Sequence, residues 1–147
     1  MVAFYLPSGL PVYSYSLIFG IGAAAGLAWI AWQSPPGARR RHADVGLLVL
    51  LGGLVGGRLS FAILNWSYYE NHLAEIPQIY LGGLAWPGAI LGGFLVLEGY
   101  VVWTGESLGA YADTLFPLLV SLVVASWLGC WVDGCAYGNV SNAWWAL

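Results

Sequence analysis

The stretch that decides the fold is residues 45–64, which read VGLLVLLGGLVGGRLSFAIL. An apolar run of about 20 residues is what a helix needs to cross the hydrocarbon core of a bilayer, which is roughly 30 Å thick. The run carries no charge except Arg58, in its second half. It therefore predicts a transmembrane helix that holds a guanidinium at membrane depth.

Arg58 needs a reason to lie there, because a guanidinium stays charged and costs at least about 2–3 kcal/mol at the centre of a bilayer. We expect its side chain to face the protein interior and to hold an anionic group, either a phospholipid headgroup or Asp133. The alternative is that Arg58 extends to the headgroup layer, which its place near the end of the run also allows.

The composition excludes a soluble domain. Hydrophobic residues make up 60% of the chain and charged residues 7%, lysine is absent, and the mean hydropathy is +0.76. A soluble domain carries charge on roughly a quarter of its residues, so lipid must be the solvent here. We expect no nucleic-acid partner for such a chain.

Apolar runs and helix breakers divide the chain into four predicted spans. They cover residues 13–32, 45–64, 79–103 and 115–132, and the third is interrupted near the Trp-Pro-Gly sequence at 86–88. Glycine and proline at membrane depth indicate a broken helix, which is tolerated where the backbone lines protein or a watery cavity. We therefore predict an all-α, polytopic membrane protein with about four transmembrane helices, the third one broken, and a single domain over residues 1–147.

The distribution of charge predicts the orientation. Arg39, Arg40 and Arg41 follow the first span, and basic loops lie on the cytoplasmic side of a membrane. The N-terminus is then outside, as are residues 65–78 and 133–147. No basic residue precedes the first apolar run, so we expect that run to be a retained span rather than a cleaved signal peptide.

Glycines stand four residues apart at several places, which puts each pair on one helical face. Such faces let neighbouring backbones approach closely. We expect most of these glycines to serve helix packing, both within the chain and with other membrane-protein subunits. The pairs are Gly22 and Gly26, Gly52 and Gly56, Gly53 and Gly57, Gly88 and Gly92, and Gly134 and Gly138.

Four motifs follow one another along the chain: residues 15–17 (YSL), 56–59 (GGRL), 82–93 (GGLAWPGAILGG) and 128–138 (LGCWVDGCAYG). In this order and spacing they resemble the N-terminal half of the prolipoprotein diacylglyceryl transferase family. The resemblance implies a bacterial inner-membrane enzyme of lipoprotein biosynthesis that moves diacylglycerol from phosphatidylglycerol to a lipobox cysteine. It also implies a bound anionic phospholipid and no other cofactor.

The resemblance assigns candidate site residues one by one. Tyr15 matches the tyrosine of the family's first-span motif, and Arg58 matches the arginine of its Gly-Gly-Arg motif. Gly134 and Gly138 match glycines of the signature loop. We expect these four residues to bind lipid, and Tyr15 is the family-matched candidate for a catalytic role.

Three positions depart from the family pattern. Pro87 stands where the resemblance implies a histidine, and Trp127 and Asn139 stand where it implies arginines. Attack of a cysteine thiol on the glycerol carbon needs cations around the leaving phosphate and a group that takes the thiol proton. Loss of one preorganised charge donor costs about a hundredfold or more in rate.

Two functions remain open after these departures. We expect a non-catalytic, transferase-like membrane subunit that gives structural or lipid-binding support to a larger complex, such as a respiratory or photosynthetic one. The alternative is a phosphatidylglycerol-prolipoprotein diacylglyceryl transferase, seen as a fragment or in a divergent form.

We expect no metal site. Glu70, His72 and Glu75 share one predicted outer loop but lack the spacing of metal ligands. Cys130 and Cys135 are five apart, a spacing poor for zinc and awkward for a disulfide on a helix. We therefore expect two packing cysteines.

Overall fold

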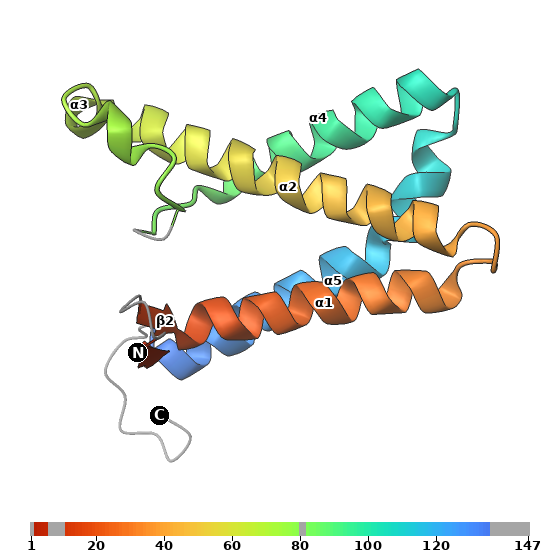
Figure 1. The fold of residues 1–147 in the computed structure, drawn as a ribbon, viewed down its shortest axis with the longest axis horizontal. Coiled ribbons are helices and arrows are strands. Elements are labelled where there is room, and N and C mark those ends of the chain that lie inside the picture. Colours follow the sequence, from red (N-terminus) through yellow and green to blue (C-terminus); the bar gives the residue numbers. More distant parts are fainter. Residues whose placement is uncertain (1, 6–10, 80–81, 136–147) are drawn as a thin grey trace, which may run out of the picture. The chain divides into compact units, whose positions relative to one another are not determined.

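The computed structural model describes residues 2–5, 11–79 and 82–135. Figure 1 shows long helices with short elements between them. In chain order the elements are β1 (Val2–Tyr5), β2 (Pro11–Tyr13), α1 (Ser14–Gln33), α2 (Arg39–Leu64), α3 (Trp66–Tyr69), the 3-10 helix η1 (Leu73–Glu75), α4 (Trp86–Thr104) and α5 (Leu108–Asp133).

The prediction of four transmembrane helices is confirmed, since α1, α2, α4 and α5 are each long and apolar enough to cross a membrane. The boundaries of three of these helices, α2, α4 and α5, differ from the prediction by more than two residues. Helix α2 already begins at Arg39, so the three arginines form its first turn instead of a loop. Helix α5 begins at Leu108 and continues through Pro117, where the prediction started the span later.

The third span was predicted as a helix over residues 79–103 that is interrupted near residues 86–88, but it is helical only from Trp86, and the predicted interruption is the first turn of α4. Gly82 and Gly83 both have a φ of +83°, in the left-handed region that glycine adopts without steric cost. Helix α4 starts only at Trp86, and Pro87 lies in its first turn, where a missing N–H costs no helical hydrogen bond. The residues that precede Trp86 therefore form an irregular entry to the helix.

A short β-hairpin at the N-terminus was not predicted. Strand β1 pairs antiparallel with β2, and Phe4 lies opposite Val12. The strands are short and merge into a strongly apolar sequence, where period-2 alternation is hard to distinguish from the start of a helix. The hairpin leads directly into α1 at Ser14.

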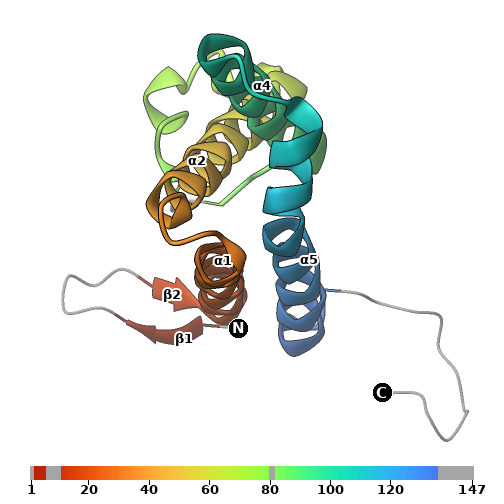
Figure 2. The same ribbon diagram turned by 90° about the vertical axis from the view of Figure 1, so that its right-hand side faces the viewer.

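The chain divides into two compact units, one formed by residues 1–26 and 117–147 and the other by residues 27–116. In the first unit α1 packs on α5, where a Cβ at Gly26 would lie 2.8 Å from Leu118 Cδ1. In the second unit α2 crosses α4 (Figures 1 and 2), and a Cβ at Gly52 would lie 2.8 Å from the Gly92 carbonyl oxygen. The glycine pairs of α1, α2 and α4 thus serve packing within the chain, as predicted, whereas a Cβ at Gly134 would have no neighbour within 4 Å.

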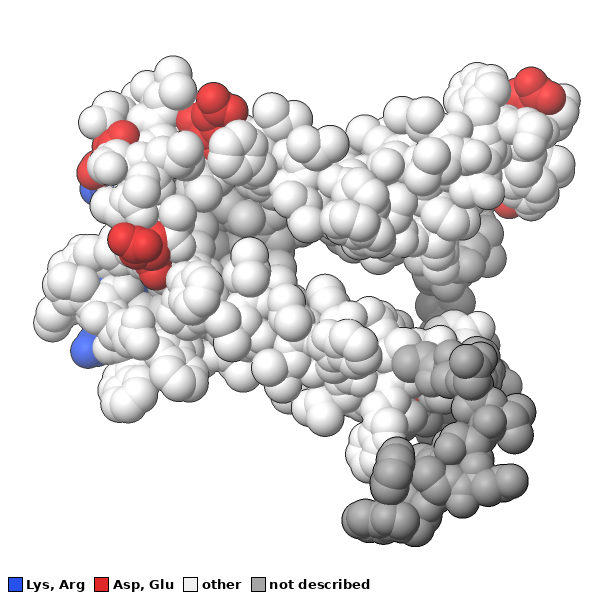
Figure 3. Space-filling view, turned by 180° about the vertical axis from the view of Figure 1, so that it is seen from behind, with Lys and Arg blue, Asp and Glu red and all other residues white. Residues whose placement is uncertain are grey.

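Most large apolar side chains of the described residues face outward. Trp103, Val102 and Trp32 are among the most exposed, whereas Ile30 and Val45 are fully buried in the second unit. Figure 3 shows a surface with few charged atoms. Lipid contact on such faces replaces the burial that a soluble protein would need, and the structure is that of a multi-pass membrane protein.

Candidate functional site

Arg58 lies in the second unit, near the end of α2, and is 4% exposed. Its Nε donates to the Ile76 carbonyl oxygen at 2.8 Å. Its Nη1 donates to the carbonyl oxygens of Gly82 and Gly83, the latter at 3.0 Å. Its Nη2 donates to the carbonyl oxygens of Glu75 at 2.9 Å and Gln78 at 3.2 Å. A guanidinium has five N–H donors, and each of them has a backbone acceptor here.

Aromatic rings and a backbone hydrogen bond fix the surroundings of this guanidinium. The centroids of the Phe61 and Tyr69 rings lie 5.9 Å and 5.5 Å from Arg58 Cζ, within cation–π range. The Ala85 N–H donates to the Gly57 carbonyl oxygen at 3.0 Å, which ties the entry of α4 to α2. The Gly-Gly-Arg motif therefore holds the following loop through both its backbone and its side chain.

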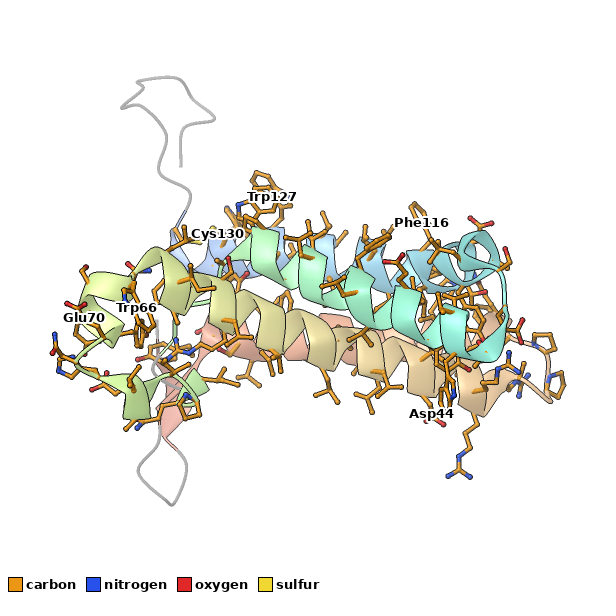
Figure 4. The ribbon with its side chains drawn as sticks, turned by 90° about the horizontal axis from the view of Figure 1, so that it is seen from above. Asp44, Trp66, Glu70, Phe116, Trp127 and Cys130 are labelled. Atoms are coloured by element: carbon orange, nitrogen blue, oxygen red, sulfur yellow. A yellow bond between two sulfur atoms is a disulfide. The ribbon has the colours of Figure 1, made fainter. Side chains whose placement is uncertain are left out.

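The loop itself is built from α3, η1 and the residues that follow, at the end of the second unit where Figure 4 labels Trp66 and Glu70. The Tyr68 hydroxyl donates to Glu75 Oε2 at 2.9 Å, and this hydrogen bond raises the pKa of Tyr68 above its ordinary value. The His72 ring stacks on the Tyr68 ring at 4.4 Å. Among the described residues no group of three His, Cys, Asp or Glu side chains could hold a metal ion.

The prediction that Arg58 faces the protein interior is confirmed by its burial. The hydrogen-bond acceptors of Arg58 in the described part of the chain are neutral carbonyl oxygens, which satisfy its donors. The role expected of Arg58 toward a phospholipid stays a prediction. Pro87, at a position where the resemblance implies a histidine, is exposed in the first turn of α4.

Tyr15 lies in the first unit, at the start of α1, and contacts the last turns of α5. Its hydroxyl is 3.0 Å from Ser126 Oγ, and its N–H donates to Asp133 Oδ2 at 3.3 Å. Gly129 makes this contact possible, because a Cβ there would lie 2.8 Å from Tyr15 Cδ2. The structure therefore brings Tyr15 to the end of α5, just before Gly134.

The other family-matched positions of α5 can be placed as follows. The Trp127 side chain is 70% exposed and stands away from the helix in Figure 4. Gly134 has a φ of +65° and follows the end of α5. Gly138 and Asn139 lie outside the described residues. Lipid binding by Tyr15, Gly134 and Gly138 stays a prediction.

The expectation of two packing cysteines was wrong. Cys130 and Cys135 form a disulfide with Cα atoms 5.0 Å apart. Helix α5 ends at Asp133, and Gly134 turns the chain back so that the Cys135 N–H donates to the Cys130 carbonyl oxygen at 3.0 Å. The prediction failed because it assumed that the helix continued through both cysteines.

A second polar cluster, at the start of α2, escaped the sequence analysis. The Arg41 guanidinium pairs with Glu106, and its Nε donates to the Tyr111 hydroxyl at 2.8 Å. Nearby, Ser34 Oγ is 2.8 Å from His42 Nδ1. The sequence signal that could have suggested the pair is the opposite charge of Arg41, before the second predicted span, and Glu106, after the third, on the same predicted side of the membrane.

Comparison with known proteins gives one family. The model of the family described as prolipoprotein diacylglyceryl transferase matches residues 1–147. A phosphatidylglycerol–prolipoprotein diacylglyceryl transferase of Lactococcus lactis subsp. cremoris is 33% identical, over 92% of this chain and 53% of the relative. Relatives of the same name from Geobacillus kaustophilus and Thermosynechococcus vestitus are 30% and 28% identical, over 90% of this chain and 47% and 50% of their own lengths.

The chain thus spans about half the length of the curated relatives it matches. These relatives carry the name of an enzyme, which contradicts the expectation of a non-catalytic subunit of a respiratory or photosynthetic complex. That expectation gave too much weight to Pro87 and Trp127 as isolated replacements. The resemblance carried by the four motifs is confirmed, and this multi-pass bacterial membrane protein belongs to the prolipoprotein diacylglyceryl transferase family.

Proposed function

We propose that this chain takes part in the transfer of diacylglycerol from phosphatidylglycerol to the cysteine of a prolipoprotein. The observation that carries the proposal is the match of the family model to all of residues 1–147. Relatives named for this reaction match at least 90% of the chain in three bacteria, which supports the same reading. The phospholipid is then the substrate, and the proposal needs no other cofactor.

The reaction forms a bond between the cysteine sulfur and a glycerol carbon of the lipid. The bond between that carbon and the phosphate oxygen breaks, glycerol phosphate leaves with the electron pair, and the thiol proton passes to a base. Positive charge near the leaving phosphate stabilises the transition state. The exposed apolar faces of the helices let lipid approach the protein from the bilayer.

Within this proposal, Tyr15 and Gly134 contact the lipid at the outer end of the first unit, and lipid binding by Gly138 is part of the same proposal. The Tyr15 hydroxyl already shares a hydrogen bond with Ser126, which fixes its direction. Pro87 has no titratable group, so the thiol proton goes to a residue other than the one at this position. Trp127 and Asn139 carry no positive charge. The cations that stabilise the leaving phosphate therefore come from other residues of the protein.

We further infer that the protein lies in the cytoplasmic membrane with its N-terminus outside. Arg39, Arg40 and Arg41 at the start of α2 favour the cytoplasmic side for that end of the helix. The disulfide between Cys130 and Cys135 lies at the end of α5, which is then outside. Disulfides form and persist in such oxidising compartments, which supports this orientation.

The test uses membranes from cells that express the open reading frame encoding this chain. The membranes are incubated with phosphatidylglycerol labelled in its acyl chains and with a lipobox peptide, and the peptide is analysed by mass spectrometry. We expect the peptide mass to rise by one diacylglyceryl group. A peptide with serine in place of the lipobox cysteine is the matched control and should stay unmodified. An unmodified cysteine peptide, with the protein present in the membranes, would contradict the proposal.

A further inference from the structure

We propose that Arg58 is a positioning residue, whose guanidinium holds residues 75–79 and 82–83 in place and through them the start of α4, and that it does not itself bind the lipid phosphate. The structural part of this proposal is independent of the reaction. Its consequence for catalysis rests on the proposed transferase function.

The number of N–H donors on the Arg58 guanidinium leaves none free for a phosphate. The five N–H groups of Arg58 point to five carbonyl oxygens, those of Glu75, Ile76, Gln78, Gly82 and Gly83. A phosphate oxygen could bind this guanidinium only if one of these carbonyl oxygens moved away. That carbonyl would then lose a charge-assisted hydrogen bond in a partly buried place, which is unfavourable.

The carbonyl oxygens that accept from Arg58 belong to two separate stretches of the chain. The carbonyl oxygens come from both sides of residues 80–81, so one side chain links the residues after η1 with the glycines that precede α4. These segments have no helix of their own to satisfy their backbone carbonyl oxygens. Arg58 takes the place of that missing hydrogen bonding.

The residues held by Arg58 lead directly into α4. Gly83 lies against the ring of Phe61, so closely that a Cβ at Gly83 would be 2.7 Å from Phe61 Cδ1. Two residues later, the Ala85 N–H donates to the Gly57 carbonyl oxygen. Helix α4 begins at the next residue, Trp86. Any release of Gly82 and Gly83 is therefore transmitted to the exposed first turn of α4.

The chemistry of the side chain gives a sharp distinction between positioning and lipid binding. A lysine keeps the positive charge but has only three donors and no planar geometry. It could still attract a phosphate, yet it could not serve five carbonyl oxygens. Free guanidinium ion has the missing shape and charge, and it could enter the space left by Arg58→Ala.

The structural experiment uses cleavage of the purified full-length protein by a protease specific for glutamate. The bond between Glu75 and Ile76 is protected if Arg58 holds the carbonyl oxygens of both residues. We expect Arg58→Ala and Arg58→Lys to raise cleavage at this bond by about tenfold or more, because local opening exposes it. Millimolar guanidinium, far below denaturing concentrations, should restore protection in Arg58→Ala.

Controls are present in the same chain. Cleavage after Glu106, in the other end of the second unit, should be the same in all variants. Arg40→Ala, which removes an exposed arginine from the same helix, should leave cleavage after Glu75 unchanged. Unchanged cleavage after Glu75 in both Arg58 variants would overturn the proposal, as would full protection in Arg58→Lys.

The catalytic experiment measures kcat and KM for phosphatidylglycerol with the lipobox peptide. Misplacement of the start of α4 should lower kcat by about tenfold or more and change KM by less than about threefold. Guanidinium should restore kcat in Arg58→Ala. A rise in KM that Arg58→Lys repairs would show that Arg58 binds the lipid and would overturn the proposal.

The two proposals fail in different ways. Absence of transfer by the unmodified protein would contradict the transferase function, while the cleavage experiment would still decide the role of Arg58. If Arg58→Ala is recovered as folded protein only when guanidinium is present during purification, that result supports the positioning role. Recovery that is equally poor with and without guanidinium, together with wild-type cleavage in Arg58→Lys, would overturn it.

Discussion

Two arginines on α2 illustrate two ways of holding a guanidinium in a membrane protein. Arg58, near the end of the helix, is 4% exposed and donates to backbone carbonyl oxygens. Arg41, in the first turn, has a side chain that is 50% exposed and pairs with Glu106, which is 42% exposed. The buried arginine has neutral acceptors, and the exposed one has a carboxylate as well as the Tyr111 hydroxyl.

The difference follows from the cost of desolvation. Burying a carboxylate beside Arg58 would mean desolvating a second charge, and the attraction between the two offsets that cost only with excellent geometry. Carbonyl oxygens satisfy the donors without that second cost. At the Arg41 end, solvent screens the pair and little is lost or gained. We therefore expect the fold to depend on the Arg58 end much more than on the Arg41 end.

The largest effect is expected from the packing that surrounds the Arg58 end. A Cβ at Gly56 would lie 2.8 Å from Gly92 Cα and in contact with the Gly88 carbonyl oxygen, so Gly56→Ala must push α2 and α4 apart. We expect it to lower the free energy of unfolding by about 1–3 kcal/mol, as overpacking does. Thermal unfolding of the detergent-solubilised protein measures this loss.

Gly99 provides the matched control, because a Cβ at this position of α4 has no atom within 4 Å. Gly99→Ala should be neutral or should stabilise the helix by up to about 1 kcal/mol. Equal effects of the two substitutions would show that the approach of α2 and α4 does not limit stability. That result would contradict the expectation that close helix packing makes the fold depend more on the Arg58 end than on the Arg41 end.

A smaller effect is expected from Arg41→Leu. The pair with Glu106 is exposed, so we expect the melting temperature to fall by less than about 3 °C. The difference between wild type and variant should shrink further as salt is added, because salt screens exposed charges. A loss as large as that of Gly56→Ala, or one insensitive to salt, would contradict the contrast between the two arginines.

Much of this fold could be predicted from hydropathy and breakers. The run at residues 45–64 gave the core of α2, and the Gly-Gly and Trp-Pro pairs gave the irregular entry to α4. The burial of Arg58 followed from the cost of its charge. These features depend on local composition, which the sequence displays directly.

The ligands of Arg58 could not be predicted in the same way. Its acceptors are backbone carbonyl oxygens, which every residue carries, so no residue type marks Glu75 or Gly83 as a partner. The expectation of an anionic partner came from charge alone. The disulfide of Cys130 depended on the end of α5 and on the turn at Gly134, and helix ends are hard to place from sequence.

The smallest effect is expected from Tyr68→Phe, which tests whether burial or location decides the strength of a contact. Tyr68 lies at the Arg58 end but is exposed, and its hydroxyl donates to Glu75. This bond raises the pKa of Tyr68 above its ordinary 10.0, so its contribution is complete below about pH 10 and is lost as the pH rises through the raised pKa. We expect almost no change in melting temperature at neutral pH, and a smaller loss of stability in strong alkali than in wild type.

Glu75→Gln, measured alone and combined with Tyr68→Phe, isolates the pair in a double-mutant cycle. A large loss at neutral pH would mean that location at the Arg58 end, and not burial, makes a contact strong.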